Sequence, residues 1–308
     1  LAWLGPGDKA LILGPTFGEY ERASRLHGAQ VLWLRANEKD FQLDLGAAVE
    51  LLRRERPRLT FLCQPNNPTG LYLGRREVEG LLEAVGDGPL VMDESYVNFV
   101  PTAWPTVPLL ESGHLFLLRS MTKDYALGGL RLGYGLGPRG VMEGLRQARP
   151  PWSVNSLAQA AGLAALKDQG HLERSLRGVE EAKAYLVAEM SAPSTGSFDK
   201  LRTASGQRLG FKVLPSAAHF FLVEVGDAPA FRSRLLRRGF CVRDCSSFGL
   251  PRFVRLAPRT LPECQRLVEA LKRLAVGCGI QRVNESVKCP TSPPTPSPLT
   301  ERGQRSGG

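Results

Sequence analysis

The sequence has 308 residues, 43% of them hydrophobic, and a formal net charge of +10 at pH 7, so it can bury a large core and two domains are expected. No apolar run is long enough to cross a bilayer and no signal peptide precedes the first predicted strand, so we expect neither a membrane span nor secretion. The six cysteines lack metal-ligand spacing and the basic residues form no run, so we expect reduced thiols in the cytoplasm, no metal and no nucleic acid.

Apolar strands and amphipathic helices alternate in the first half of the sequence. Strands are predicted at 10–13, 31–34, 59–63, 90–92, 114–118 and 132–136, with helices ending near 28 and at about 44–56 and 75–85. This alternation indicates an α/β fold, with a mainly parallel sheet covered by helices on both faces. The sequence begins without methionine, and we expect an upstream part of the large domain to be missing.

The second half predicts a smaller α+β domain. After a short helix reaching 149, a long helical region covers 155–190, and the polar, non-periodic residues 191–209 indicate a flexible insertion. Strands are predicted at 211–214, 219–225, 240–243 and 253–257, with a helix near 228–238 and a final helix that Thr260 and Glu263 can cap. From about 284 the composition is typical of disorder. The predicted divisions are 1–150 (large domain), 151–190 (connecting helices), 191–209 (insertion), 210–280 (small domain) and 281–308 (disordered tail).

Three chemistry-bearing residues each follow the end of a predicted strand in the first domain. Asn67 lies in a rigid turn with a proline on either side, Asp93 follows an apolar strand, and Lys123 comes after the strand 114–118. Ligands of parallel α/β sheets bind at the carboxyl ends of the strands. These residues are therefore expected to meet at one site.

The stretch around Lys123 suits a cofactor that carries an aldehyde and a phosphate. A lysine held at a strand end can have its pKa lowered by burial and nearby cations, which frees the amine as a nucleophile. Two hydroxyls, Ser120 and Thr122, precede it, and Arg131 follows eight residues later. Hydroxyls and a guanidinium suit a phosphate. Together these groups are what pyridoxal 5'-phosphate (PLP) needs.

Each of these residues, considered alone, could also have a purely structural role. Asp93 could partner a pyridinium nitrogen or cap a helix, and Tyr96 could reach the same ligand or be a core aromatic. The Asn67 turn could be a tight surface turn. Phe17 and Tyr20 offer flat faces for stacking on a ring but could equally serve packing.

Four ordered motifs resemble one family. Asn66-Asn-Pro-Thr-Gly70, Asp93-Glu-Ser-Tyr96, Ser120-Met-Thr-Lys123 and Gly129-Leu-Arg-Leu-Gly133 resemble fold-type I PLP enzymes of the class I/II aminotransferase family. The resemblance covers roughly residues 1–276 apart from the insertion. It is closest to the branch of histidinol-phosphate aminotransferase and threonine-phosphate decarboxylase. It implies a three-layer α/β/α large domain, a smaller C-terminal domain and a homodimer.

The resemblance implies a role for each matching residue. Lys123 would hold the cofactor covalently and move the proton at the substrate Cα, while Asp93 would keep the pyridine nitrogen protonated. Asn67 and Tyr96 would bond the ring's phenolic oxygen, and Phe17, in preference to Tyr20, would stack on the ring. The phosphate would be bound by Ser120, Thr122 and Arg131.

For the substrate, the resemblance implies contacts from the small domain. Arg243 and Arg255 match arginines that bind the substrate's carboxylate or phosphate, with Asn155 and Arg259 as weaker candidates. The leading function is an aminotransferase acting on a small, possibly phosphorylated amino acid. The alternatives are a threonine-phosphate decarboxylase of corrinoid synthesis and a truncated, inactive fragment. Two features depart from the family: its opening segment has no counterpart here, and His219 stands where relatives usually have asparagine.

Overall fold

The computed structural model describes residues 2–191 and 209–277. The predicted tail at 281–308 lies outside the described residues, as does the predicted insertion apart from its two end residues. Among the described helices, none combines the length and apolar character needed to cross a membrane.

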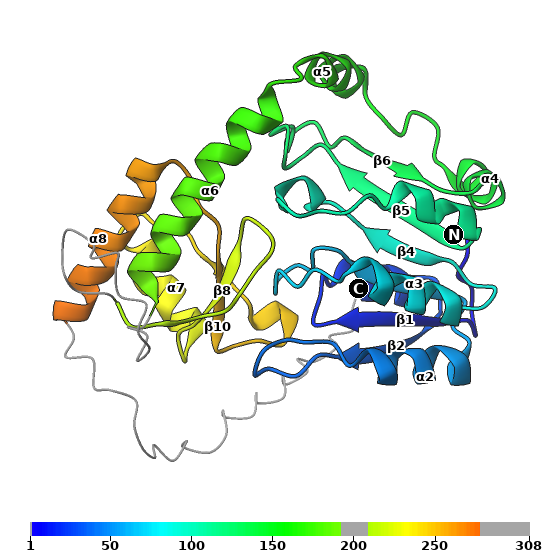
Figure 1. Ribbon diagram of the computed structural model, residues 1–308, viewed down its shortest axis with the longest axis horizontal. Coiled ribbons are helices and arrows are strands. Elements are labelled where there is room, and N and C mark those ends of the chain that lie inside the picture. The colour runs from blue at the N-terminus through cyan, green and yellow to red at the C-terminus, as the bar shows by residue number, and fades with distance from the viewer. Residues whose placement is uncertain (1, 192–208, 278–308) are drawn as a thin grey trace, which may run out of the picture.

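The larger sheet occupies one half of the molecule and has the order β2-β1-β3-β4-β5-β6 (Figure 1). All neighbouring strands from β2 to β5 pair in parallel, and β6 pairs antiparallel to β5 at the edge. The alternation of apolar strands with helices predicted this sheet, and the α/β fold class is confirmed. The strand bounds are β1 Lys9–Gly14, β2 Gln30–Arg35, β3 Leu59–Cys63, β4 Leu90–Asp93, β5 Leu115–Ser120 and β6 Gly133–Leu136.

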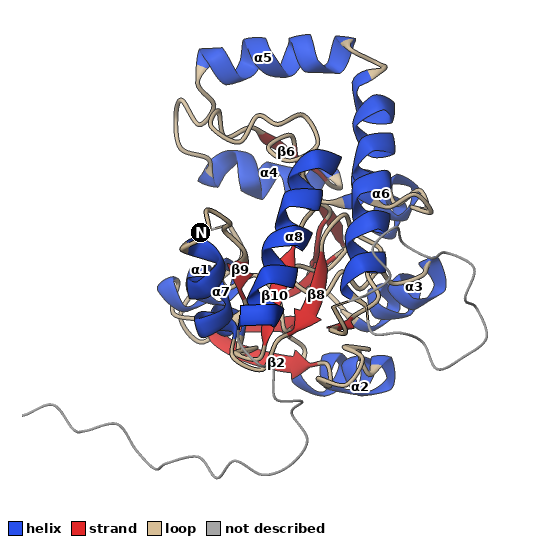
Figure 2. Cartoon of the chain, turned by 90° about the vertical axis from the view of Figure 1, so that its left-hand side faces the viewer, coloured by secondary structure: helices blue, strands red, loops and turns tan. Residues whose placement is uncertain are grey.

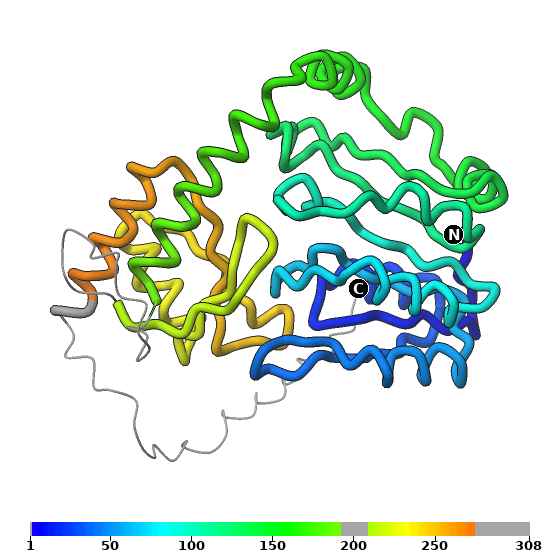
Figure 3. The backbone as a smooth tube through the Cα atoms, viewed as in Figure 1, coloured from blue at the N-terminus to red at the C-terminus, as the bar shows by residue number. Residues whose placement is uncertain are grey.

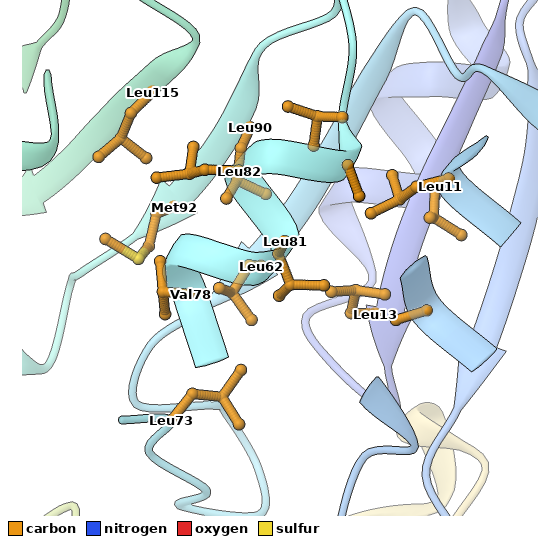
Figure 4. Close-up of a cluster of buried hydrophobic side chains, with 14 of the residues drawn as sticks. Leu11, Leu13, Leu62, Leu73, Val78, Leu81, Leu82, Leu90, Met92 and Leu115 are labelled. Atoms are coloured by element: carbon orange, nitrogen blue, oxygen red, sulfur yellow. The ribbon is translucent and has the colours of Figure 1, made fainter. Parts of the chain in front are cut away.

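Helices cover both faces of this sheet because its strands are apolar on both sides. On one face, side chains of β1, β3, β4 and β5 pack against α2 and α3, as Figure 4 shows for Leu11, Met92 and Leu115. On the other face, α1 packs near Ile12 and α4 near Val91. The result is a three-layer domain. The helix bounds are α1 Glu19–Leu26, α2 Leu45–Glu55, α3 Arg75–Ala84 and α4 Arg139–Ala148.

The second half of the chain forms a small antiparallel sheet in the order β7-β8-β10-β9. Helices α6, α7 and α8 pack against it around a separate core that includes Leu186, Phe221 and Val268 (Figure 2). The bounds are α5 Ser156–Lys167, α6 His171–Met190, β7 Lys212–Val213, β8 Phe221–Glu224, α7 Ala228–Leu236, β9 Arg243–Asp244, β10 Phe253–Leu256 and α8 Leu261–Gly277.

Two sequence expectations differ from the structure. The helical region predicted at 155–190 is divided into α5 and α6, because Asp168 ends one helix and Gly170, a poor helix former, precedes the next. The strand predicted at 240–243 is replaced by the two-residue β9 at the sheet edge. Its apolar residues Phe240 and Val242 pack into the small-domain core from a loop.

Candidate active site

The carboxyl ends of the central strands open into a cavity of about 370 Å³ that the small domain closes from the other side. Cys63 of β3 pairs with Asp93 of β4, and Asp93 pairs with Leu118 of β5, so the ends of β3 and β4 lie level with each other and two residues before the end of β5. Predicted site residues from both domains line this cavity: Phe17, Asn67, Asp93, Tyr96, Lys123, Arg243 and Arg255.

The Asp93 carboxylate is held by two donors. Its Oδ1 atom accepts the Ser95 backbone N–H at 2.9 Å, and its Oδ2 atom accepts the Tyr20 hydroxyl at 2.5 Å. The Tyr20 ring stacks on Phe61, with ring centres 4.9 Å apart. Burial, with smaller effects of Cys63 and Asp93, raises the pKa of Tyr20 well above its usual value, so its hydroxyl keeps the proton that it donates.

Sequence reasoning missed this function of Tyr20, which it considered only for stacking on a ring or for packing. The available signal was its position on α1 between Glu19 and Glu21, where a buried tyrosine needs a partner for its hydroxyl. The structure supplies that partner from β4, 73 residues away in the sequence. Cys63 lies in the same cavity wall. Burial and the charge of Asp93 raise the pKa of its thiol to about 12.

Lys123 follows the end of β5, close to two hydroxyls. Its Nζ atom donates to Thr122 Oγ1 at 2.6 Å, and that oxygen lies 2.7 Å from Ser120 Oγ. Burial first, and then the charge of Arg131, lower the pKa of Lys123, while Asp93 opposes the shift. The amine therefore loses its proton more readily than a lysine in water.

Arg131 completes the predicted phosphate-binding group. It lies near enough to Lys123 to affect the lysine's pKa, and its guanidinium donates to the Gly128 carbonyl at 3.1 Å. Because it is exposed, it retains donors that face solvent. Ser120, Thr122 and Arg131 thus lie beside Lys123 although they are not among the lining residues of the cavity itself.

The turn that carries Asn67 contacts the small domain directly. Asn66 stabilises this turn by donating to Pro15 O and Thr69 Oγ1, each at 2.8 Å. Arg255 donates to Asn67 Oδ1 across the cavity. At Gly70, with φ +74°, an added Cβ would overlap the Ser216 side chain, and the Gly70 carbonyl accepts the Ala217 N–H at 3.0 Å.

Two aromatic rings form opposite sides of the cavity. Phe17 is 43% exposed and lies edge-to-face with Tyr20, so one of its ring faces is available for stacking. Phe248 lies on the small-domain side, and the Arg243 guanidinium carbon lies 5.4 Å from its ring centre. Arg243 also donates to Ser247 Oγ at 2.7 Å.

His219 lies directly behind Tyr96. Its ring centre is 5.5 Å from that of Tyr96 and 4.0 Å from that of Phe99. Burial, followed by the charge of Arg255, lowers the pKa of His219 to about 3, so the ring is neutral. Its Nδ1 atom is buried without a hydrogen-bond partner among the described residues.

Two predicted substrate residues lie away from the cavity lining. Asn155 caps α5 by accepting the Ala158 N–H at 2.8 Å and donates to the Leu130 carbonyl at 3.3 Å. Arg259 pairs with Glu263 at 2.8 Å. A substrate contact for either residue stays a prediction.

The cavity residues fit PLP chemically. Asp93 is a carboxylate held in one orientation, which suits a protonated ring nitrogen. Lys123 is a partly buried amine, which suits an aldehyde, and an exposed aromatic face is available at Phe17. The hydroxyls of Ser120 and Thr122 suit a phosphate.

Comparisons with known proteins point to one family. Residues 1–271 match the family described as aminotransferase class I and II. The histidinol-phosphate aminotransferase of Symbiobacterium thermophilum is 38% identical over 273 residues, which cover 88% of this chain and 70% of the relative. The solved histidinol-phosphate aminotransferase from Clostridium acetobutylicum matches with a TM-score of 0.76 at 22% identity, over 88% of this chain and 79% of that chain.

A further solved structure, L-threonine-O-3-phosphate decarboxylase from Porphyromonas gingivalis, has a TM-score of 0.70 at 26% identity and covers 88% of this chain and 78% of that chain. The family match spans well over half of the chain. It confirms the predicted cofactor, because members of this family depend on PLP. The chain therefore belongs to the class I and II aminotransferases and is a PLP-dependent transaminase.

Proposed function

We propose that this aminotransferase takes the amino group of histidinol phosphate, or of a closely similar phosphorylated amine, and transfers it to a 2-oxo acid. The observation that carries the proposal is the charge of the cavity, where Lys123, Arg243 and Arg255 face the single carboxylate of Asp93. With Arg131 beside Lys123, two sets of cations are available, one for the cofactor phosphate and one for the substrate phosphate. The curated relative reported above, a histidinol-phosphate aminotransferase, supports this substrate.

The curated relatives favour the aminotransferase over the two alternative functions. Histidinol-phosphate aminotransferases from several species are 32–38% identical to this chain, so a threonine-phosphate decarboxylase or an inactive fragment is not favoured. By the same resemblance we propose a homodimer that works in the cytoplasm. We also propose the division into a large domain, connecting helices and a small domain, because one buried core lies within residues 11–117 and another within 182–271.

The proposed roles of the residues follow from their contacts. When bound, PLP supplies a ring that withdraws electrons from the substrate Cα. Lys123, whose lowered pKa favours the free amine, would hold the cofactor and then take and return the Cα proton. Asp93, fixed by Tyr20 and Ser95, would hold a proton at the ring nitrogen.

The remaining residues would bind and orient. Tyr96 and Asn67 would bond the ring's phenolic oxygen, and Phe17 would lie against the ring. Ser120, Thr122 and Arg131 would hold the cofactor phosphate. Arg243 and Arg255 would bind the substrate, with the planar guanidinium forks favouring an oxyanion.

The test uses the PLP-loaded protein with histidinol phosphate and a panel of 2-oxo acids. We expect an amino acid to form from at least one 2-oxo acid, with no release of carbon dioxide. Histidinol, which lacks the phosphate, should have a KM at least about tenfold higher, because charge-assisted hydrogen bonds are lost. Carbon dioxide release from threonine phosphate without amino transfer would contradict the proposal, as would equal KM values for histidinol phosphate and histidinol.

A further inference from the structure

A loop of the large domain reaches into the core of the small domain. It joins β2 to α2, and Figure 3 shows it extending from the blue part of the chain towards the small domain. Residues 37–40 of the loop are exposed, but Phe41 is only 3% exposed. Its φ angle is +57°, a conformation that L side chains rarely adopt. The backbone of this loop thus has an unfavourable φ angle at the residue whose ring is buried.

The Phe41 ring packs among residues of the small domain. It lies edge-to-face with Phe253 of β10, with ring centres 5.4 Å apart. The same buried cluster contains Cys245, Phe248 and Leu250, which belong to the turn between β9 and β10. Phe41 therefore supports this turn without itself lining the cavity.

A second contact from the same part of the large domain reaches this turn independently. Arg35, at the end of β2, donates from Nη1 to the Phe248 carbonyl at 3.3 Å. The Arg35 guanidinium lies over the Trp33 ring, 4.5 Å from its centre, which limits the orientations of the arginine. The apolar cluster that contains Phe41 thus packs against the Phe248 side chain, and Arg35 holds the Phe248 backbone.

The supported turn forms the substrate side of the cavity. Phe248 lines the cavity, and Arg243 lies over its ring and donates to Ser247 of the same turn. A shift of this turn would move the Arg243 guanidinium. Lys123 and Asp93, in contrast, are positioned by strands of the large sheet.

We propose that Phe41 and Arg35 are positioning residues for substrate recognition, which hold the Phe248 turn so that Arg243 faces the substrate. The proposal rests on the proposed function, since it assumes that Arg243 binds the substrate. Neither residue lines the cavity, so both act through Phe248 and Arg243. Loss of either contact should weaken substrate binding and leave the chemical step intact.

The experiment compares PLP-loaded Arg35→Met and Phe41→Ala with the control Phe231→Ala. Phe231 of α7 also makes an edge-to-face contact within the small domain, with its ring centre 5.8 Å from that of Phe211. It belongs to the core around Leu186 and Val268 and does not line the cavity. We expect the KM for histidinol phosphate to rise about tenfold in the two test variants, with kcat within about twofold of wild type, and neither value to change in the control.

A second readout monitors the turn itself. The amides of Phe248, Gly249 and Leu250 donate to carbonyls within the turn, so their hydrogen exchange should become faster in Arg35→Met and Phe41→Ala. The affinity for PLP should stay at the wild-type value. Phe41→Leu replaces Phe41→Ala if the latter does not fold.

Unchanged KM and unchanged amide exchange in both test variants would overturn the proposal, as would an equal rise of KM in the control. Arg243→Ala separates this result from a failure of the proposed function. If Arg243→Ala raises KM but the two test variants do not, only the positioning proposal fails. If Arg243→Ala leaves KM unchanged, the substrate role assigned to Arg243 fails as well.

Discussion

The two walls of the cavity are built differently. On the large-domain side, Asp93 ends β4 and Lys123 follows β5, in a mainly parallel sheet whose side chains, such as Leu115 and Leu117, are fully buried. On the small-domain side, Arg243 belongs to a strand of two residues, and Phe248 to a turn supported by the large domain. The groups proposed to handle protons thus lie on a rigid frame, while the groups proposed to select the substrate lie on short elements with separate supports.

The largest effect is expected from Lys123→Ala on the rigid wall. Loss of the amine should lower the transamination rate about 10³-fold or more, because the group that moves the Cα proton is gone. The visible absorbance of the PLP-loaded protein should also change, since the covalent attachment is lost. Transamination assays and spectra of the exposed control Lys167→Ala should match wild type. Retention of a tenth of the activity in Lys123→Ala would contradict the assignment.

The contribution of the β4 and β5 strand ends to stability can be tested at Glu94. Its side chain is fully buried and accepts a hydrogen bond from Arg119 Nε at 2.8 Å, an ion pair between the ends of β4 and β5. Glu94→Gln should lower the free energy of unfolding by about 3 kcal/mol, because a partly buried guanidinium loses its charge partner. Urea unfolding of the control Glu79→Gln, which breaks a pair with the exposed Arg75, should show a loss of only about 0.5 kcal/mol. Equal losses would contradict this account of the frame.

On the substrate wall, Arg255→Lys should separate binding from chemistry. Lysine keeps the charge but lacks the planar fork with which Arg255 contacts Asn67 and faces the cavity. We expect the KM for histidinol phosphate to rise about tenfold, with a smaller fall in kcat. Steady-state kinetics of Arg174→Lys, in an exposed ion pair with Asp168, serve as the control. A fall in kcat with unchanged KM would place Arg255 with the catalytic wall instead.

At neutral pH the smallest effect is expected at His219, where the two walls meet, because its ring is then uncharged in both the folded and the unfolded chain. The pKa of His219 is about 3 in the folded protein against 6.5 for an ordinary histidine, so the unfolded chain binds a proton that the folded chain does not. Stability should therefore fall as the pH decreases from about 6.5 towards 3. His219→Asn should remove part of this slope when the free energy of unfolding is measured against pH, and His27→Asn should not. An unchanged slope in His219→Asn would contradict the burial of a neutral ring.

Local sequence pattern was sufficient for the sheet and for bringing Asn67, Asp93 and Lys123 to one site, whereas Arg243 and Arg255 were assigned to it from the family resemblance. The residues at the ends of β3, β4 and β5 were predicted to meet because parallel strands end at one edge. The bond between Tyr20 and Asp93 spans 73 residues, and that between Arg255 and Asn67 spans 188. The burial of Phe41 depends on a cluster more than 170 residues further along the chain. Such contacts leave no periodic signal, so they require the folded structure.

Gly70 sets how near the two domains can come. Because an added Cβ would overlap Ser216, any other residue at this position would push the small domain outwards. The Asn67 turn and the arginines opposite it would then separate, and the entrance between them would widen. The missing side chain at Gly70 therefore allows the close approach through which Arg255 reaches Asn67.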